Sequence, residues 1–448
     1  MKLEDLAQGR TAVLGFGRES QALESVVLER LPGAKVQVFS EQAGPQVPEH
    51  WSITIAPLAD APLHRFDRIL RSPGVPVDHP ALVAARSDGA EITTSSSLWF
   101  SERAQARTIV VTGSKGKSTT SALLAHMLNV AGIKTCLAGN IGIPLISLLD
   151  EPADCFVIEL SSYQLVDLIA APSVGVITRL FPEHVDWHGS VDRYYAAKLQ
   201  LLELLQGRPL WINARDTVLK SAVDGYAALC QANLEDGLHS QPDGLYDGPS
   251  KRLNSRDWAL RGQHNLDNLA LAISVAETIN PGISEYVDAA RSFQPLAHRL
   301  ESIRDNEARE WINDSISTTP YATQAALDCC GSDVVLIAGG LDRPADWSEL
   351  VAQQDGRRFT GVVGLPDNGQ QVIDALVRGG LVDPDKVRVV ADMSGAVRAA
   401  VDLANAESQI LLSPGAPSFP HFRDFEDRGN QFRQAIADRA QPQTEQGA

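Results

Sequence analysis

Residues 108–128, TIVVTGSKGKSTTSALLAHML, carry an apolar segment, a turn rich in glycine, lysine and serine, and a second apolar segment with helical character. A strand, a loop and a helix in this order surround phosphate oxygens with backbone N–H groups and the positive end of the helix dipole. Val111 replaces the first glycine of the usual G-x-x-x-x-G-K-[ST] pattern, which excludes a strict Walker loop. The stretch still predicts a nucleotide-triphosphate site on an α/β sheet, and a chance arrangement is the alternative.

Within this loop, Lys117 is expected to reach the β- and γ-phosphates of a nucleoside triphosphate and Ser118 to bind Mg²⁺. The two glycines let backbone N–H groups converge on the phosphate oxygens. The predicted phosphate loop as a whole comprises Gly113, Ser114, Lys115, Gly116, Lys117, Ser118 and Thr119.

Three successive blocks of the sequence alternate strand-like and helix-like segments, which predicts an α/β protein of three domains. We expect a Rossmann-like domain at residues 1–102, a central P-loop ATPase-type domain at 103–297, and a second Rossmann-like α/β domain at 298–448. Residues 237–252 are rich in turn formers and predict a surface hairpin.

Charge and cysteine content narrow the range of partners. A net charge of −17 and a pI near 5.0 oppose binding to nucleic acid or to an acidic membrane. The five cysteines form no C-x-x-C pair, and no uncharged apolar run reaches the ~18 residues that could span a bilayer. The sequence therefore predicts a cytoplasmic protein that acts on small molecules without membrane insertion, and we expect a monomer.

Acidic and basic side chains follow the phosphate loop along the chain. Glu159 ends the apolar run CFVIE, where a buried carboxylate is costly unless a cation is near. Mg²⁺ held by Ser118 is one candidate, and an ion pair with a surface arginine is the alternative. Further on, His184 could ligate a second metal, whereas Lys198 suits such a site only if its charge is removed. For His188 an ordinary hydrogen-bonded role is favoured over ligation.

The segment LGFGRES near the N-terminus is a partial dinucleotide-binding fingerprint. Gly15 and Gly17 follow a predicted strand, but Ser20 replaces the third glycine. A truncated fingerprint is weak evidence for NAD. The segment predicts a loop for phosphates of a nucleotide, without identifying the nucleotide.

Several motifs in order along the chain point to one family. TGSKGKSTT, NIGIPL, ELSSYQL, H-x-D-x-H-G with a later A-A-K, HNLDNLALA, HRLE, NDSISTTP and LLSPGAPSFPHFRDFEDRG together resemble the Mur ligases. Within that family they are most similar to the ligases that add glutamate to UDP-N-acetylmuramoyl-L-alanine for peptidoglycan synthesis. The resemblance extends over essentially the whole chain.

The resemblance implies roles for individual residues. Lys117 would contact the γ-phosphate, and Lys198 would be carbamylated, which turns its cation into an anionic oxygen ligand. The Mg²⁺ ligands would be Ser118, Glu159, His184 and the carbamate of Lys198. Further ATP contacts would be Asn268, Arg299 and Asp314. The UDP group would meet Gly15, Phe16, Gly17, Arg18, Ser72, Pro73 and Gly74, and the muramoyl peptide would meet Asn140, Ser161 and His184.

The implied reaction transfers the γ-phosphoryl group of ATP to the alanyl carboxylate, and the amine of glutamate then attacks the acyl phosphate. Folylpolyglutamate synthase is a related alternative, but as a family it lacks the N-terminal nucleotide-sugar domain that residues 1–102 resemble. An ATP-hydrolysing switch is an alternative from another class. The N-K-x-D base-reading motif of GTPase switches is absent from the sequence.

The third block departs from the pattern of ligases that add D-glutamate. Those enzymes commonly read N-D-S-K-A-T-N, whereas this chain reads NDSISTTP and has Ile316 at the lysine position. An aliphatic side chain cannot hold a carboxylate, so we expect a rebuilt pocket that prefers L-glutamate. D-glutamate with other anchors is the alternative. The candidate glutamate-binding residues are Thr318, Arg343, Ser418 and Phe425.

Overall fold

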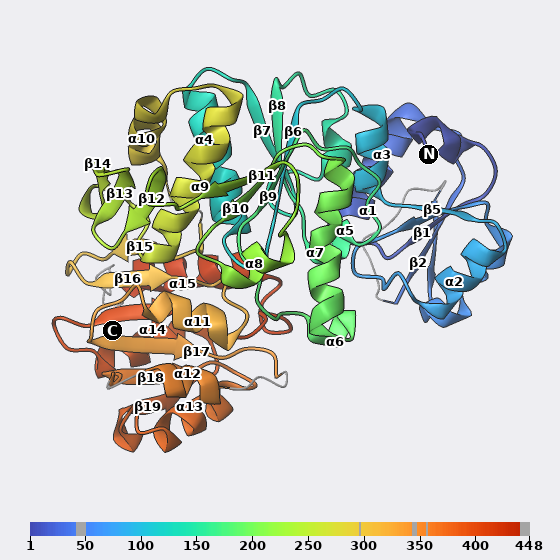
Figure 1. Cartoon of the computed structure of the whole chain (residues 1–448). Helices are drawn as coiled ribbons and strands as arrows, with labels where there is room; N and C mark the ends of the chain where they lie inside the picture. Colours follow the sequence, from blue (N-terminus) through green and yellow to red (C-terminus); the bar gives the residue numbers. More distant parts are fainter. Residues whose placement is uncertain (42–50, 295–296, 343–346, 355–356, 440–448) are drawn as a thin grey trace. The chain divides into compact units, whose positions relative to one another are not determined.

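The computed structural model describes residues 1–41, 51–294, 297–342, 347–354 and 357–439 (Figure 1). The chain divides into two compact units. The first comprises Met1–Trp258 and Gln263–Phe293, and the second Ala259–Gly262 and Gln294–Ala448. Each unit is described on its own below.

The N-terminal part of the first unit is a parallel sheet with the strand order β3-β2-β1-β4-β5. The order reverses at β1, and ligands of such sheets bind beyond the carboxyl ends of the strands at this reversal. This places the two loops after β1 and β4 next to each other. The strands are β1 (Thr11–Leu14), β2 (Val36–Ser40), β3 (Trp51–Ile55), β4 (Arg68–Arg71) and β5 (Glu91–Thr93), and the helices are α1 (Arg18–Arg30), α2 (Pro80–Ser87) and α3 (Ser95–Glu102).

The central sheet of the first unit is also parallel, with the order β11-β10-β9-β6-β8-β7. Its middle strands are buried from end to end, as expected for continuous Val/Ile runs covered on both faces. The strands are β6 (Thr108–Thr112), β7 (Thr135–Gly139), β8 (Cys155–Glu159), β9 (Val174–Ile177), β10 (Leu210–Asn213) and β11 (Leu229–Ala232).

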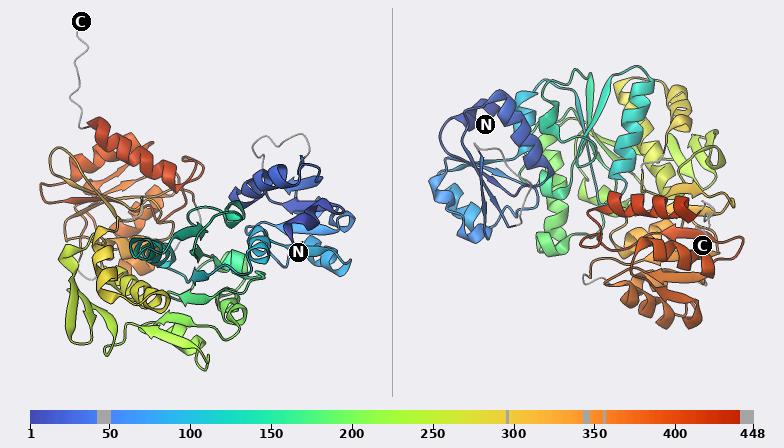
Figure 2. Two further views of the ribbon diagram at one scale, coloured as in Figure 1. Left: turned by 90° about the horizontal axis from the view of Figure 1, so that it is seen from above. Right: turned by 180° about the vertical axis from the view of Figure 1, so that it is seen from behind.

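Helices cover both faces of the central sheet. The phosphate-loop helix α4 (Lys117–Val130) packs along α9 (Gln263–Ile279), and α7 (Val191–Leu205) lies on the opposite face (Figures 1 and 2). Gly175 of β9 allows α7 to approach, since a Cβ there would lie 2.6 Å from a methyl group of Leu205. The remaining helices are α5 (Ser162–Leu165), α6 (Val185–His188), α8 (Thr217–Ala222) and α10 (Ile283–Ser292).

The turn-rich segment after β11 forms a small antiparallel sheet. The expected hairpin is present as β12 (Leu238–Gln241) and β13 (Gly244–Asp247), and β14 (Ser250–Asn254) extends it by a third strand. Strand β12 of this small sheet packs against α9. The small sheet is therefore part of the support for this helix.

The second unit is built on a sheet with the order β15-β16-β20-β17-β18-β19, in which only β15 runs antiparallel to its neighbour. Separate apolar clusters cover its two faces, one around Trp311 and Phe432 and one around Trp347 and Leu350. The strands are β15 (Glu301–Arg304), β16 (Glu310–Asn313), β17 (Val334–Ala338), β18 (Gly361–Gly364), β19 (Val387–Val389) and β20 (Gln409–Leu412), and the helices are α11 (Pro320–Leu327), α12 (Ser348–Gln353), α13 (Gly369–Arg378), α14 (Met393–Leu403) and α15 (Phe425–Arg439).

The predicted fold class is confirmed, since three largely parallel sheets alternate with helices along the chain. Within the described ranges, no helix combines the length and the apolar character that crossing a bilayer requires.

Candidate functional site

The phosphate loop joins β6 to α4, and its two glycines adopt backbone conformations that other residues rarely take. Gly113 has φ 138° and Gly116 has φ 88°. A Cβ at Gly113 would lie 2.1 Å from Oγ1 of Thr178, and one at Gly116 would lie 2.5 Å from Oδ1 of Asn268. The close packing therefore requires glycine at both positions. It also places the predicted ATP contact Asn268 directly against the loop.

Neighbouring segments hold the loop in place. Ser114 N–H donates to the carbonyl of Arg179 at 2.7 Å, and Ser114 Oγ donates to the carbonyl of Phe181 at 2.8 Å. The hydroxyl of Tyr194 donates to Ser114 Oγ at 3.0 Å. Lys117 Nζ donates to the carbonyl of Ser114 at 3.0 Å. The loop is thus already shaped by the protein, which lowers the ordering cost of binding a phosphate.

Glu159 ends β8 beside the phosphate loop and is fully buried. Its β-sheet partners are Val111 and Gly139 on the two adjacent strands. Its Oε1 accepts a hydrogen bond from Asn140 Nδ2 at 2.7 Å, while Oε2 has no hydrogen-bond partner among the described residues. A buried carboxylate oxygen without a donor is costly, so this position fits a cation.

Lys198 lies in the middle of α7 with its side chain buried. Its Nζ donates to the carbonyl of Gly113 at 2.7 Å and lies 4.7 Å from the centre of the Tyr194 ring. Burial, reinforced by the nearby cation of Lys117, holds the pKa of Lys198 well below its usual value; Glu183 and Glu159 only partly oppose this. An amine in these surroundings favours its neutral form.

Glu183 and His184 lie in the segment that joins β9 to α6. Glu183, which the sequence reasoning missed, pairs with Lys115 at 2.8 Å. Burial would raise the pKa of Glu183, but Lys115, Lys117 and His184 together lower it. His184 has φ 53° and an exposed edge, and partial burial together with the cations of Lys198 and Lys117 lowers its pKa, against the opposing charge of Glu183. A neutral imidazole can act as a metal ligand.

His188 takes the ordinary role that the sequence favoured. Its Nε2 lies 3.0 Å from Ser162 Oγ, and the ring is buried and stacked against Tyr163. Ser161, a predicted substrate contact, is the N-cap residue of α5 and donates through Oγ to Oε1 of Gln164 at 2.9 Å.

The described side chains alone do not complete a metal site. Among them, no three His, Cys, Asp or Glu residues gather closely enough to hold an ion. Mg²⁺ commonly uses one or two carboxylates together with substrate phosphates and water. The unpaired oxygen of Glu159, the buried Ser118 at the start of α4 and a bound nucleotide fit that kind of coordination.

The start of α9, which carries Asn268, is held by a buried cluster. Asp267 accepts hydrogen bonds from Arg179 at 2.7 Å and from Arg215 at 2.8 Å. Its Oδ1 also accepts from Ser240 Oγ at 2.5 Å. These contacts join the segments after β9 and β10 and the strand β12 to one carboxylate.

The loops after β1 and β4 meet as the strand order requires. Ser72 N–H donates to the carbonyl of Leu14 at 3.0 Å, and Ser72 Oγ donates to the carbonyl of Gly15 at 3.1 Å. Ser20, the departure from the dinucleotide fingerprint, has its Oγ 2.8 Å from Ser72 Oγ. The structure thus brings together the two predicted UDP loops, with Phe16 buried and the other predicted contacts partly or fully exposed: Gly15, Gly17, Arg18, Ser72, Pro73 and Gly74.

The loop after β4 is shaped by Arg71, another residue that the sequence reasoning missed. This fully buried arginine pairs with Asp167 through two nitrogens, one of them Nε at 2.7 Å. Its Nη1 donates to the carbonyls of Ser72, Pro73 and Val75. No local pattern in the sequence reveals this contact, because Asp167 lies 96 residues away.

In the second unit, Asp314 follows β16 and lies near Arg299. Its carboxylate accepts from Ser317 Oγ, from Ser413 Oγ at 3.0 Å and from Leu300 N–H at 3.2 Å. Burial raises the pKa of Asp314 to about 6, although the serine donors and Arg299 oppose the shift. Both predicted ATP contacts of this unit therefore belong to one electrostatic cluster.

The candidate glutamate residues are placed only in part. Arg343 lies outside the described residues. Thr318 is exposed, Ser418 is buried, and Phe425 begins α15 with its carbonyl accepting from Ser315 Oγ at 2.8 Å. The buried Arg428 donates to both Ser315 and Ala416. It therefore joins the loop after β16, which carries Thr318, to the loop after β20, which carries Ser418.

Replacing Asp314 by Asn should change stability in a pH-dependent way. The folded-state pKa lies above that of a free aspartate, so ionisation destabilises the fold; this penalty is absent below about pH 4, grows between pH 4 and 6, and is complete above pH 6. Asp314→Asn should therefore raise the free energy of unfolding at pH 8 by up to about 3 kcal/mol and much less at pH 4. Urea unfolding at both pH values checks this, and an equal effect at both would contradict it.

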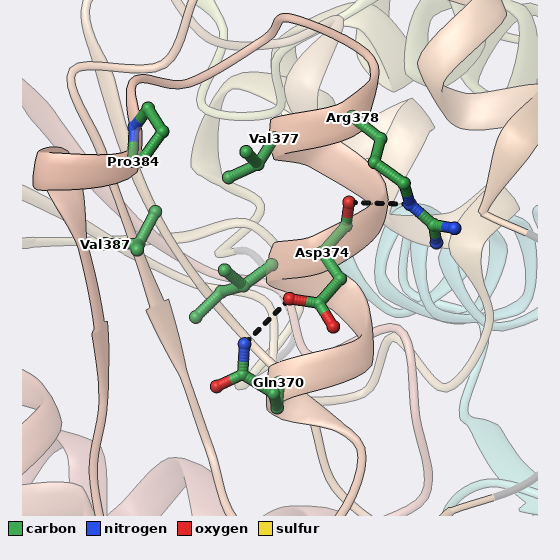
Figure 3. Close-up of a pocket in the computed structure, with 7 residues that line it drawn as sticks. Gln370, Asp374, Val377, Arg378, Pro384 and Val387 are labelled. Atoms are coloured by element: carbon green, nitrogen blue, oxygen red, sulfur yellow. Dashed lines mark hydrogen bonds between the residues drawn. The ribbon is translucent and has the colours of Figure 1, made fainter.

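A pocket of about 410 Å³ lies on the second unit between α13 and the segment that leads into β19 (Figure 3). Its lining mixes apolar side chains with polar and charged ones, and Gln370 donates to Asp374 at 2.8 Å. None of the predicted site residues lines it. The lining residues are Gln370, Ile373, Asp374, Val377, Arg378, Pro384 and Val387.

Known proteins resemble this chain over nearly its full length. Residues 111–276 match the Mur ligase middle domain, and residues 298–416 match the Mur ligase glutamate ligase domain. A UDP-N-acetylmuramoyl-L-alanine--L-glutamate ligase of a Micromonospora strain is 38% identical, covering 98% of this chain and 99% of the relative. The protein of the same name from Xanthomonas oryzae pv. oryzae is 36% identical, covering 97% and 96%.

Solved structures share the fold. MurF ligase from Thermotoga maritima in complex with ADP matches with a TM-score of 0.62 at 14% identity, covering 98% of this chain and 97% of that one. MurC of the same organism matches with a TM-score of 0.58 at 16% identity, covering 96% and 100%. The predicted family and the predicted enzyme class, an ATP-dependent ligase, are thus confirmed. This chain belongs to the Mur ligase family.

Proposed function

We propose that this enzyme joins L-glutamate to the alanyl carboxyl group of UDP-N-acetylmuramoyl-L-alanine and converts ATP to ADP and phosphate. The observation that carries the proposal is the near full-length similarity to relatives named for this reaction. The shaped phosphate loop, with a buried carboxylate and a buried amine beside it, supports the ATP-dependent step.

The chemistry follows from the poor reactivity of a carboxylate. Transfer of the γ-phosphoryl group to a carboxylate oxygen gives an acyl phosphate and ADP. The amine of glutamate then attacks the acyl carbon, phosphate leaves, and the nitrogen loses a proton to give the amide. Lys117 and the N–H groups of the phosphate loop offset the negative charge that builds up when phosphate and carboxylate approach.

The residues around the loop suit Mg²⁺ as the accompanying cation. Ser118, Glu159, His184 and a carbamylated Lys198 would hold it. When bound, the ion would neutralise phosphate charge and help to align the reacting groups. Asn268 would contact ATP beside the phosphate loop. Arg299 and Asp314 stay predictions as ATP contacts.

The UDP group would bind the two loops that meet beyond β1 and β4. Gly15 has φ 80°, and a Cβ there would lie 3.2 Å from Ser72. Glycine therefore lets the two loops approach each other. Backbone N–H groups of such strand-end loops, together with the start of α1, are suited to a pyrophosphate. Asn140 and Ser161 would face the muramoyl peptide.

The net charge of −17 supports an enzyme without a nucleic-acid partner. We infer that it acts as a monomer in the cytoplasm and without membrane insertion.

The preference for L-glutamate is the most specific part of the proposal. Ile316, half-buried after β16, cannot supply the positive charge that a lysine would supply. The two enantiomers carry the same groups, so selecting one requires carboxylate anchors in a different place relative to the attacking amine. Arg343, Thr318, Ser418 and Phe425 remain the candidates for that pocket.

ADP release with UDP-N-acetylmuramoyl-L-alanine and each glutamate enantiomer tests the proposal. We expect kcat/KM for L-glutamate to exceed that for D-glutamate by roughly tenfold or more, since a misplaced carboxylate loses charge-assisted hydrogen bonds. Omitting the UDP substrate is the control and should abolish turnover. An equal or higher kcat/KM for D-glutamate would reject the assigned enantiomer, and turnover independent of the UDP substrate would reject the ligase reaction.

A further inference from the structure

A buried carboxylate at the start of α9 connects the two sides of the phosphate loop. Asp267 has only 3% of its side chain exposed, and it pairs with Arg179 at 2.7 Å and Arg215 at 2.8 Å. Ser240 Oγ and Gln263 Nε2 also donate to Oδ1, at 2.5 and 3.2 Å. Every oxygen of this carboxylate is therefore used, and its charge is compensated by two cations.

Arg179 contacts one side of the loop through its backbone. Its carbonyl accepts the N–H of Ser114 at 2.7 Å, and its N and O atoms lie 3.0 and 3.1 Å from the place of a Cβ on Gly113. The same residue reaches Asp267 with its guanidinium group. A displacement of that side chain would thus act on the backbone that shapes the loop.

Asn268 contacts the other side of the loop. It follows Asp267 directly, is buried, and has its Oδ1 2.5 Å and its Nδ2 3.2 Å from the place of a Cβ on Gly116. The Asp267 carbonyl also accepts from Asn233 Nδ2 at 3.2 Å, which fixes the second turn of α9. The position of Asn268 therefore depends on how firmly this turn is held.

We propose that Asp267 is a positioning residue for nucleotide binding. Its ion pairs with Arg179 and Arg215 keep the second turn of α9 against the phosphate loop, so that Asn268 and Gly116 present a fixed surface to ATP. The inference rests on the proposed use of ATP. It assigns no contact between Asp267 and the nucleotide itself.

Asp267→Asn is the main test, because it removes the charge while keeping the size and one acceptor oxygen. We expect the Kd for ADP, measured by calorimetry with the full chain and Mg²⁺, and the KM for ATP to rise roughly tenfold, since small misplacements of binding groups cost this much or more. The KM for UDP-N-acetylmuramoyl-L-alanine should stay within about twofold. A residue that only stabilises the fold would lower the active fraction without changing these constants.

Arg179→Gln keeps the proposal testable if Asp267→Asn does not fold, since the Arg179 side chain is 39% exposed and Arg215 remains to compensate Asp267. It should raise the Kd for ADP in the same direction. Glu151→Gln is the matched control, because it breaks a solvent-accessible pair with Lys134 at 3.3 Å before β7 and β8, at the opposite edge of the same sheet, and should leave the Kd unchanged.

The outcomes separate this inference from the proposed function. If both cluster variants are folded and bind ADP like the wild type, the positioning role is wrong while the ligase proposal stands. An equal increase in the KM for ATP and the KM for UDP-N-acetylmuramoyl-L-alanine would also overturn the positioning role of Asp267. If the wild type binds ADP but forms no amide, the ligase proposal fails, and the calorimetric comparison still decides the role of Asp267.

Discussion

Lys117→Ala and Glu159→Ala should each lower kcat/KM for ligation by about a hundredfold or more, because Lys117 offsets phosphate charge in the transition state and Glu159 would hold the Mg²⁺ that also offsets it. Lys117 begins α4 with its amine on the phosphate loop, and Glu159 presents a buried oxygen that has no hydrogen-bond donor among the described residues. Initial rates of ADP release with saturating glutamate measure the effect.

Both variants are expected to stay folded. Removing the Glu159 side chain leaves Asn140 Nδ2 without its acceptor, but Asn140 is exposed and water can replace the lost partner. Lys134→Ala, which removes an exposed lysine of the same domain, serves as the control and should keep wild-type activity. Thermal unfolding confirms that the proteins are folded. Near-wild-type turnover in either site variant would show that the phosphate and metal assignment is wrong.

Lys198→Ala should also lower kcat/KM for ligation by roughly a hundredfold or more, if the lysine acts as a carbamate that supplies an anionic ligand. The Nζ atom lies against the carbonyl of Gly113 in a buried position close to Lys117, where an uncharged amine is favoured over a second cation. A neutral amine adds to CO₂ and releases one proton to give the carbamate. The product would place an anion, in place of a neutral amine, beside the cation of Lys117.

Chemical rescue distinguishes this role from a structural one. A small carboxylic acid such as formate or acetate should restore part of the activity of Lys198→Ala, because it supplies the missing oxygen atoms. The same acid should have no effect on the wild type or on Lys117→Ala. A carbamate signal from the wild type labelled with ¹³C-bicarbonate gives independent support. Full activity of Lys198→Ala would reduce Lys198 to a structural residue of α7.

The phosphate loop and the fold class could be predicted because their determinants are local. The alternation of apolar segments with helical ones indicates parallel sheets covered by helices. Gly113 and Gly116 mark positions where the backbone must approach other atoms, and the structure shows positive φ and short Cβ distances at both. The ordered motifs along the chain also predicted the family, which the comparisons confirm.

The surroundings of the loop could not be predicted, since they depend on residues far apart in the sequence. Glu183 pairs with Lys115 across 68 positions, and the only hint was its place next to His184. Asp267 meets Arg179 and Arg215, and the hydrogen bonds join residues that are 88 and 52 positions apart. None of these three pairs follows a helical or strand spacing that a sequence pattern could reveal.

The strands, glycine turns and helices of individual segments follow from the sequence alone, because backbone conformation and apolar periodicity are properties of neighbouring residues. Which charges meet depends on the tertiary fold. The parallel order β10-β9-β6-β8-β7 brings the carboxyl ends of five strands to one edge, and so gathers Arg215, Arg179, Gly113, Glu159 and Asn140 there. Burial of Lys198 beside that edge, together with the cation of Lys117, then holds its pKa well below the usual value, and burial of Glu159 leaves one of its oxygens without a donor in the described part of the chain.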